Sequence, residues 1–191
     1  MSQRNSEYER KPNDLYETPR WVTEVLIDNL PRIAGKVWEP AAGNGSMARV
    51  LAENFDVISS DVECPSSWPA ELPDLTVHDF FHEPITAAEA IITNPPFTKG
   101  VCLPFVERAL QLTEKHRGVV AMLQRVDWDS AKTRAHLFAD HPAFAKKVVL
   151  RKRITWFVEA NGKPRSSPSE NHSWFIWDWL HAGPPTIAYA P

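Results

Sequence analysis

The chain has 191 residues, of which 43% are hydrophobic and 24% charged, with a formal net charge of −3. This composition is ordinary for one globular domain, and no apolar run approaches the roughly 20 residues that cross a bilayer. The polar N-terminus lacks the apolar stretch of a secretory signal, and Cys64 and Cys102 have no metal-ligand spacing, so we expect a reduced cytoplasmic protein without a bound metal.

The N-terminal part of the chain predicts a short segment followed by a helix. Residues 1–14 are polar and lack periodicity, which predicts a flexible segment ahead of a single domain over residues 15–191. We expect the first helix to begin with Thr18 as its N-cap and Pro19 as its first residue, and to continue to Leu30.

Short apolar runs and helical stretches then alternate along the chain. Strands are predicted at residues 36–38, 56–60, 75–77, 90–93, 118–123, 147–157 and 173–179. Helices are predicted between them at residues 46–54, 101–116 and 130–139. This order predicts an α/β fold of the Rossmann-like type, a mostly parallel sheet with helices on both faces.

The C-terminal part of the chain departs from this alternation. The last two predicted strands are joined without a helix, which predicts an antiparallel pair at one edge of the sheet. The dipeptide Pro184-Pro185 after Gly183 predicts the start of a tail. No internal repeat or linker indicates a second domain.

A glycine-containing turn, Glu39-Pro40-Ala41-Ala42-Gly43-Asn44-Gly45, lies between the first predicted strand and the next helix. Gly43 and Gly45 let the backbone turn tightly and approach a ligand at the helix N-terminus. With Ala48 the turn also matches the weak fingerprint of dinucleotide-binding proteins. Glu39 would repel a pyrophosphate, however, and suits a ligand with a sulfonium and an ammonium group. The turn therefore favours S-adenosylmethionine over a nicotinamide dinucleotide.

Two acidic residues follow the next two predicted strands. Asp61 can accept hydrogen bonds from ribose hydroxyls, and Asp79 can bind an adenine amine beside the aromatic face of Phe80. Because the carboxyl ends of parallel strands share one edge of a sheet, we expect both acids to lie near the glycine turn.

The tetrapeptide Asn94-Pro95-Pro96-Phe97 ends the fourth predicted strand. Two prolines fix the backbone and remove two N–H donors, which leaves the Asn94 amide and the Pro95 carbonyl as hydrogen-bond acceptors. These acceptors suit a planar aryl amine, a poor nucleophile whose hydrogens they could draw out of the ring plane. Phe97 could stack on an extruded base. The tetrapeptide therefore predicts methylation of an exocyclic amine.

These residues resemble the class I S-adenosylmethionine-dependent amino-methyltransferases, and especially the solitary phage-type DNA adenine-N6 enzymes, over roughly residues 15–179. Residues 94–97 match the family's (Asn/Asp/Ser)-Pro-Pro-aromatic motif, and residues 39–45 match its cofactor loop. Residues 16–19 are similar to its N-terminal motif, which closes over the methionine end of the cofactor. The order of these motifs is similar to the γ-type arrangement.

The resemblance implies a seven-stranded sheet with an antiparallel last strand and assigns roles to individual residues. It implies catalytic roles for Asn94, Pro95, Pro96 and Phe97. It implies cofactor contacts by Thr18, Pro19, Glu39, Pro40, Ala41, Gly43, Gly45, Asp61, Asp79, Phe80 and Asn94.

Many DNA methyltransferases carry a long target-recognition domain, for which this chain has no room. Residues 51–90 hold nine acidic side chains and no Lys or Arg, whereas residues 91–171 hold fourteen Lys or Arg and seven acids. The basic part could contact a polyanion along one face. The predicted phosphate contacts are Lys146, Lys147, Arg151, Lys152, Arg153, Lys163 and Arg165.

Several alternatives to a DNA substrate remain open. The same tetrapeptide occurs in enzymes that methylate adenine in ribosomal or transfer RNA, and in enzymes that methylate a glutamine amide in protein. A cofactor-binding module that has lost activity, and serves as an interaction protein, is an alternative of another class. A nicotinamide-dependent oxidoreductase is disfavoured by Glu39 and by the prolines.

Overall fold

The structure is a computed structural model that describes residues 16–66, 68–82, 84, 88–98, 100–156 and 169–190. The segment predicted to be flexible, residues 1–14, lies outside the described residues, as do Lys163 and Arg165. No helix among the described residues is long and apolar enough to cross a membrane.

Eight strands within the described residues form one sheet in the order β3-β2-β1-β4-β5-β7-β6-β8. The strands are β1 (Val37–Glu39), β2 (Val57–Asp61), β3 (Thr76–Val77), β4 (Ala90–Thr93), β5 (Val119–Arg125), β6 (Phe144–Leu150), β7 (His172–Asp178) and β8 (Thr186–Ala190). The helices are α1 (Arg20–Ile27), α2 (Ser46–Leu51) and α3 (Cys102–Glu114), with two 3₁₀ helices, η2 (Trp128–Ser130) and η3 (Lys132–Leu137).

The predicted mostly parallel sheet is confirmed, and β7 is its antiparallel strand. The predicted pairing of the last two strands is also confirmed, since β6 and β7 pair antiparallel. The predicted bounds of the first of them, 147–157, are wrong, because β6 spans Phe144–Leu150. The predicted place of this pair at the sheet edge is wrong, because β8 lies outside β6 and β7 lies between β5 and β6. The tail predicted from residue 183 is wrong as well, since β8 follows there and pairs parallel with β6. This strand makes the sheet one strand wider than expected.

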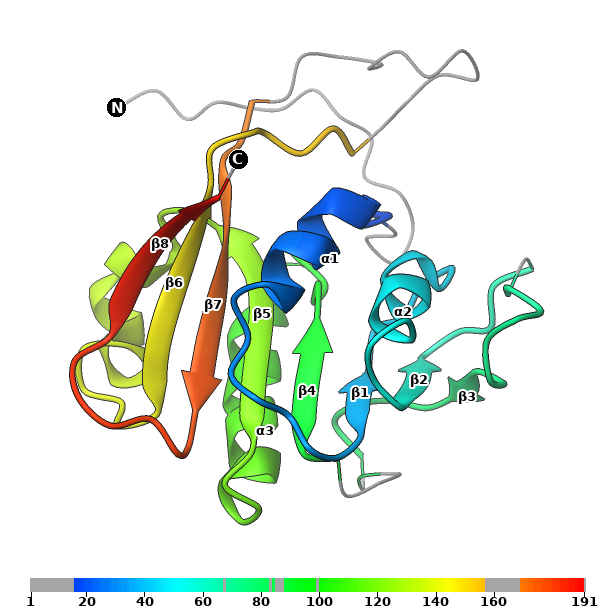
Figure 1. Cartoon of the computed structure of the whole chain (residues 1–191), viewed down its shortest axis with the longest axis horizontal. Helices are drawn as coiled ribbons and strands as arrows, with labels where there is room; N and C mark the ends of the chain where they lie inside the picture. Colours follow the sequence, from blue (N-terminus) through cyan, green and yellow to red (C-terminus); the bar gives the residue numbers. More distant parts are fainter. Residues whose placement is uncertain are drawn as a thin grey trace.

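Helices cover both faces of the sheet, as Figure 1 shows, with α1 and α2 on one face and α3 on the other. Under α1 and α2 the core includes Leu26, Met47 and Trp174. On the α3 face it includes Phe105 and Trp177. Strands buried on both faces need apolar residues almost throughout, which explains the continuous apolar runs in β4 and β5.

Two predicted helices differ from the observed ones. Pro19, not Thr18, is the N-cap of α1, because its extended backbone (φ −61°, ψ 145°) lies outside the helical region. Thr18 is buried and makes no capping hydrogen bond. The helix predicted at residues 130–139 is replaced by η2 and η3, which the extended Ala131 separates (φ −81°, ψ 129°).

Trp174 connects α1 to the centre of the sheet. It is fully buried in β7, and its indole N–H donates to the Val22 carbonyl of α1 at 2.9 Å. We expect Trp174→Phe to lower the free energy of unfolding by about 1–3 kcal/mol, because it removes this bond and leaves a small cavity. Chemical denaturation would measure the change. Trp68→Phe, at a half-buried indole that also donates to a carbonyl, should cost less; an equal loss would contradict a special role for Trp174.

Candidate active site

A pocket of about 330 Å³ lies at the carboxyl ends of β1, β2 and β4. Its walls include the Tyr16–Thr18 segment, the glycine turn after β1, Asp61, the residues after β3, Asn94 and Pro96 after β4, and the start of α3. The sequence-predicted cofactor residues are thus brought together, except that Pro19 and Gly45 do not line the pocket. The volume lies within the range of small-molecule sites.

The glycine turn is held in its shape by local hydrogen bonds. Gly43 and Gly45 both have positive φ angles, 54° and 81°, which side chains with a Cβ rarely adopt. The Gly43 N–H donates to Asp61 Oδ2 at 2.8 Å. Asn44 Oδ1 accepts hydrogen bonds from the backbone N–H and the hydroxyl of Ser46, at 3.2 and 2.8 Å. The turn therefore presents its backbone to the pocket beside the start of α2.

Glu39 is a buried acid with an unsatisfied oxygen at the pocket wall. The side chain is 1% exposed, and Oε2 has no hydrogen-bond partner among the described residues. Burial, together with the nearby charge of Asp61, raises the pKa of Glu39 well above its ordinary value. A hydrogen bond from the Ala48 backbone acts in the opposite direction and lowers this pKa. A cation placed in the pocket would reverse this effect and favour the carboxylate.

Asp61 and Asp79 border the pocket with part of their oxygen atoms already engaged. Asp79 Oδ1 accepts the Phe81 N–H at 2.9 Å, so the carboxylate is held in a turn after β3. Phe80 is 2% exposed and stacks on Phe105 with 4.2 Å between ring centroids. This stack fixes the aromatic wall beside Asp79.

The tetrapeptide after β4 places one polar acceptor in the pocket. Asn94 lines the pocket, its Nδ2 donates to the Tyr16 carbonyl at 3.4 Å, and its buried Oδ1 has no partner within the described part of the chain. The hydrogen bond to Tyr16 orients the amide, so its oxygen is the free end. Pro96 also lines the pocket, whereas Pro95, which is buried, and Phe97 do not.

An aromatic cluster, formed by Tyr16, Phe97, Trp156 and His172, lies beside the pocket. Phe97 is 6.1–6.2 Å from each of the other three rings, measured between centroids. Trp156 contacts Tyr16 and His172 at 5.6 and 5.2 Å. Sequence reasoning identified Phe97 but missed Trp156 and His172, since single aromatic side chains outside a motif carry no distinguishing pattern.

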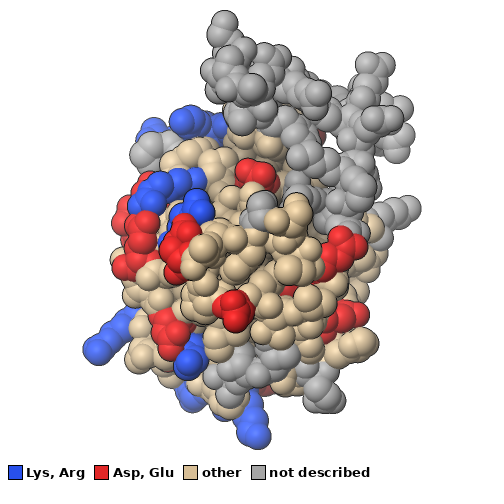
Figure 2. Space-filling view, turned by 90° about the vertical axis from the view of Figure 1, so that its right-hand side faces the viewer, with Lys and Arg blue, Asp and Glu red and all other residues tan. Residues whose placement is uncertain are grey.

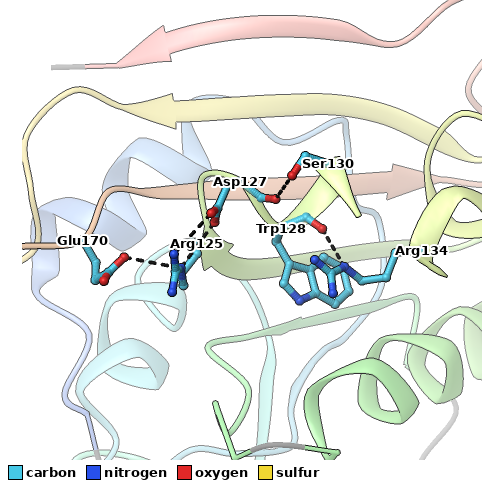
Figure 3. A network of polar contacts seen from close by, with 6 residues as sticks. All are labelled: Arg125, Asp127, Trp128, Ser130, Arg134 and Glu170. Carbon is cyan, nitrogen blue, oxygen red and sulfur yellow. Dashed lines mark hydrogen bonds and ion pairs between the residues drawn. The ribbon is translucent and has the colours of Figure 1, made fainter. Parts of the chain in front are cut away.

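His172 lies at the start of β7, opposite Arg125 in the register of the sheet. The pKa of His172 is lowered to about 4, chiefly by burial and then by the charge of Arg125. A backbone hydrogen bond with Glu170 acts in the opposite direction and raises this pKa. Figure 3 shows Arg125 between Asp127 and Glu170, with side-chain distances of 3.2 and 3.3 Å. His172 is therefore neutral at physiological pH, and the aromatic cluster carries no positive charge of its own.

The predicted phosphate-binding residues fall into two groups. Lys146 Nζ donates to the Asn29 carbonyl at 3.0 Å, and Lys147 forms a half-buried ion pair with Asp129 at 2.7 Å. Arg151, Lys152 and Arg153 are exposed just after β6, at the same edge of the sheet as the pocket. The side of the molecule at the β3 edge shows dispersed acidic side chains, with Lys and Arg toward its borders (Figure 2).

Comparisons with known proteins support the fold. No protein-family model and no curated protein sequence matches the chain. The methyltransferase subunit of a type I restriction-modification system from Streptococcus thermophilus has a similar structure, with a TM-score of 0.61 and 12% identity over 92% of this chain and 47% of that one. A Listeria monocytogenes protein inferred to be a class I S-adenosylmethionine-dependent methyltransferase gives a TM-score of 0.54 and 14% identity, over 89% of this chain and 62% of that one.

A Pyrococcus horikoshii protein inferred to be an RNA methyltransferase gives a TM-score of 0.55 and 16% identity, over 85% of both chains. The chain has the class I methyltransferase fold. It spans about half the length of the restriction-modification subunit and under two thirds of the Listeria protein. In a methyltransferase fold of this kind the observed pocket lies where the strand order reverses, between β1 and β4, which is the general ligand site of open α/β sheets.

The raised pKa of Glu39 predicts how stability depends on pH. The folded state holds the proton of Glu39 more tightly than the unfolded chain does. The contribution of protonated Glu39 to the free energy of unfolding is therefore fully present at low pH, and it is lost as pH rises from the ordinary Glu range through the raised pKa. We expect Glu39→Gln to abolish this loss and to raise the denaturation midpoint at neutral pH. Denaturant titrations of both proteins across this pH range would measure it, and a lower midpoint for the variant at neutral pH would contradict the burial argument.

Proposed function

We propose that the protein transfers a methyl group from S-adenosylmethionine to an exocyclic amine, specifically to adenine N6 in DNA. The observation that carries the proposal is the Asn94 amide oxygen, which is buried, oriented and unpartnered among the described residues at the wall of the pocket. A buried acceptor without a partner is costly, which favours a ligand that donates a hydrogen bond to it.

The pocket residues fit the cofactor in charge and shape. Glu39 offers an unpaired buried oxygen to the positively charged end of the cofactor, and its deprotonation on binding would release a proton. Asp61 and Asp79 follow successive strands, in positions that suit the ribose and the adenine amine. When bound, the cofactor supplies an activated methyl group on a sulfonium, so the protein needs no strong nucleophile of its own.

The acceptor amine would be activated by position and hydrogen bonding. Asn94 Oδ1 can accept one hydrogen of a planar amine, and the Pro95 carbonyl can accept the other. Drawing these hydrogens out of the ring plane would return electron density to the amine nitrogen. That nitrogen would take the methyl group as its bond to sulfur breaks, with S-adenosylhomocysteine as the leaving group, and the methylated amine would then lose one proton to solvent. Phe97 would stack on the base, and the neutral His172 leaves no positive charge in the cluster to disfavour a developing cation.

Two similarities support DNA as the substrate. The phage-type resemblance of residues 94–97 favours DNA, and the structural similarity to a restriction-modification subunit agrees with it. The similarity to a protein inferred to be an RNA methyltransferase keeps adenine N6 in ribosomal or transfer RNA as the second candidate. Methylation of a glutamine amide and an inactive interaction module remain alternatives, and the free Asn94 oxygen argues against the inactive module.

The central test uses radiolabelled S-adenosylmethionine with unmethylated DNA, total RNA and cell protein in parallel. We expect label on DNA adenine, and Asn94→Ala should reduce transfer by about 10²–10³-fold while most S-adenosylhomocysteine binding remains, because the change removes the hydrogen bond to the acceptor amine and only one of many cofactor contacts. Asn94→Asp is the matched control: it keeps an acceptor oxygen and should retain more activity than Asn94→Ala.

Each other outcome revises a different part of the proposal. Label on RNA or protein would keep the chemistry and replace the substrate. Equal loss of transfer and cofactor binding in Asn94→Ala would refute the acceptor role. Absence of transfer from a wild-type protein that binds the cofactor would favour the inactive module.

The exposed basic residues after β6 provide a test of nucleic-acid binding. Replacing Arg151, Lys152 and Arg153 by Ala should weaken DNA binding and reduce its salt dependence, because each phosphate contact releases counterions. The matched control replaces Lys36, Lys115 and Arg117, three exposed cations at the opposite edge of the sheet. Fluorescence anisotropy at several salt concentrations would separate the two variants, and equal effects would exclude a specific role for the β6 end.

A further inference from the structure

Within the described part of the chain, the outer edge of β8 pairs with no other strand. Among the residues that the structure describes, β8 pairs only with β6, and Figure 1 shows it as the outermost strand on its side of the sheet. Sheet edges are ordinarily protected by charged side chains, bulges or very short strands. The opposite edge strand, β3, has only two residues. β8 has five residues, Thr-Ile-Ala-Tyr-Ala, and none is charged.

The direction of the backbone groups shows which residues of β8 can pair outward. The Arg151 N–H donates to the Ala190 carbonyl at 3.2 Å, so the backbone of Ala190 faces β6. Because successive residues of a strand alternate, Thr186 and Ala188 also face β6. The N–H and C=O groups of Ile187 and Tyr189 therefore face away from the sheet.

The side chains of the same two residues are exposed. Ala188 and Ala190 pack against the core on the α1 face, and the alternation places Ile187 and Tyr189 on the other face. Ile187 is 61% exposed and Tyr189 is 68% exposed. The two residues with outward backbone groups are thus also the two with large uncovered apolar side chains.

We propose that β8 pairs antiparallel with β8 of a second copy of this chain, about a twofold axis at Ala188. In this register Ile187 lies opposite the partner's Tyr189 on the same face, and by symmetry Tyr189 lies opposite the partner's Ile187. Aromatic and β-branched side chains form favourable cross-strand pairs. The outward N–H and C=O groups of both residues exchange hydrogen bonds with the partner.

Prolines select this register. An axis at Ile187 would place Tyr189 opposite the partner's Pro185, and an axis at Tyr189 would place Ile187 opposite the partner's Pro191. Proline has no N–H to donate, so each of these registers loses hydrogen bonds. The axis at Ala188 pairs every outward-facing residue of β8 with a residue that has an N–H.

The absence of charge on β8 favours pairing with a second copy, whereas the small buried area limits the affinity of the dimer. No like charges meet across the axis, because the strand is uncharged. Two strands of five residues bury less than the about 800 Å² per partner of a standard interface, so the dimer should exchange with monomer. Antiparallel pairing directs the two carboxyl edges in opposite directions, which leaves both pockets accessible.

Sedimentation velocity of the full chain over a range of concentrations tests the proposal. The mass of the wild-type protein should double as its concentration rises. Ile187→Lys combined with Tyr189→Lys places Lys opposite Lys and should stay monomeric. Its matched control, Ile187→Lys combined with Tyr189→Glu, places Lys opposite Glu and should still dimerise.

Three results would overturn the proposal: a wild-type protein that is monomeric at every concentration, a Lys–Lys variant that dimerises like the wild type, or a Lys–Glu variant that dimerises no better than Lys–Lys. Hydrogen exchange of the wild-type protein gives an independent measurement if the variants fail to fold. The amides of Ile187 and Tyr189 should exchange more slowly as concentration rises, and unchanged rates would equally refute the pairing.

Discussion

The hydrogen bond from the Gly43 N–H to Asp61 joins the ends of β1 and β2, and the geometry of the pocket depends on it. It orients the carboxylate that closes β2 and holds the glycine turn against that strand. The same carboxylate contributes to raising the pKa of Glu39 at the end of β1. One interaction thus couples the shape of the turn to the charge state of the buried acid.

Two acids close together without a cation between them are unfavourable, so the charge of the pocket favours a cationic ligand. A ligand with positive charge relieves the repulsion, whereas a pyrophosphate would increase it. The proposed cofactor would place a positive charge at a Rossmann-like turn, where a pyrophosphate would be repelled. In the proposed function, the residue that distinguishes the two ligand classes is Glu39 rather than either glycine.

Much of the fold and of the pocket could be predicted from sequence, because both depend on local patterns. Short apolar runs such as β4 indicate buried strands, and Asp61 and Asp79 could be placed because parallel strands share a carboxyl edge. What could not be predicted depends on contacts between distant residues. The position of β7 inside the sheet is set by its pairing with both β5 and β6, and β8 is a strand only because β6 offers it an edge.

The aromatic cluster shows the same limit in the candidate site. The glycine turn, Asp61 and Asp79 follow strand ends, where local patterns could place them. The cluster instead brings Trp156 and His172 to Tyr16 and Phe97 from distant segments, through ring contacts that no short pattern encodes. Burial of His172 lowers its pKa, so this ring adds no positive charge beside the pocket. Local patterns could therefore place the residues that follow the strands, including Asn94 and Phe97 of the tetrapeptide, whereas the rings that surround Phe97 are brought there by the fold.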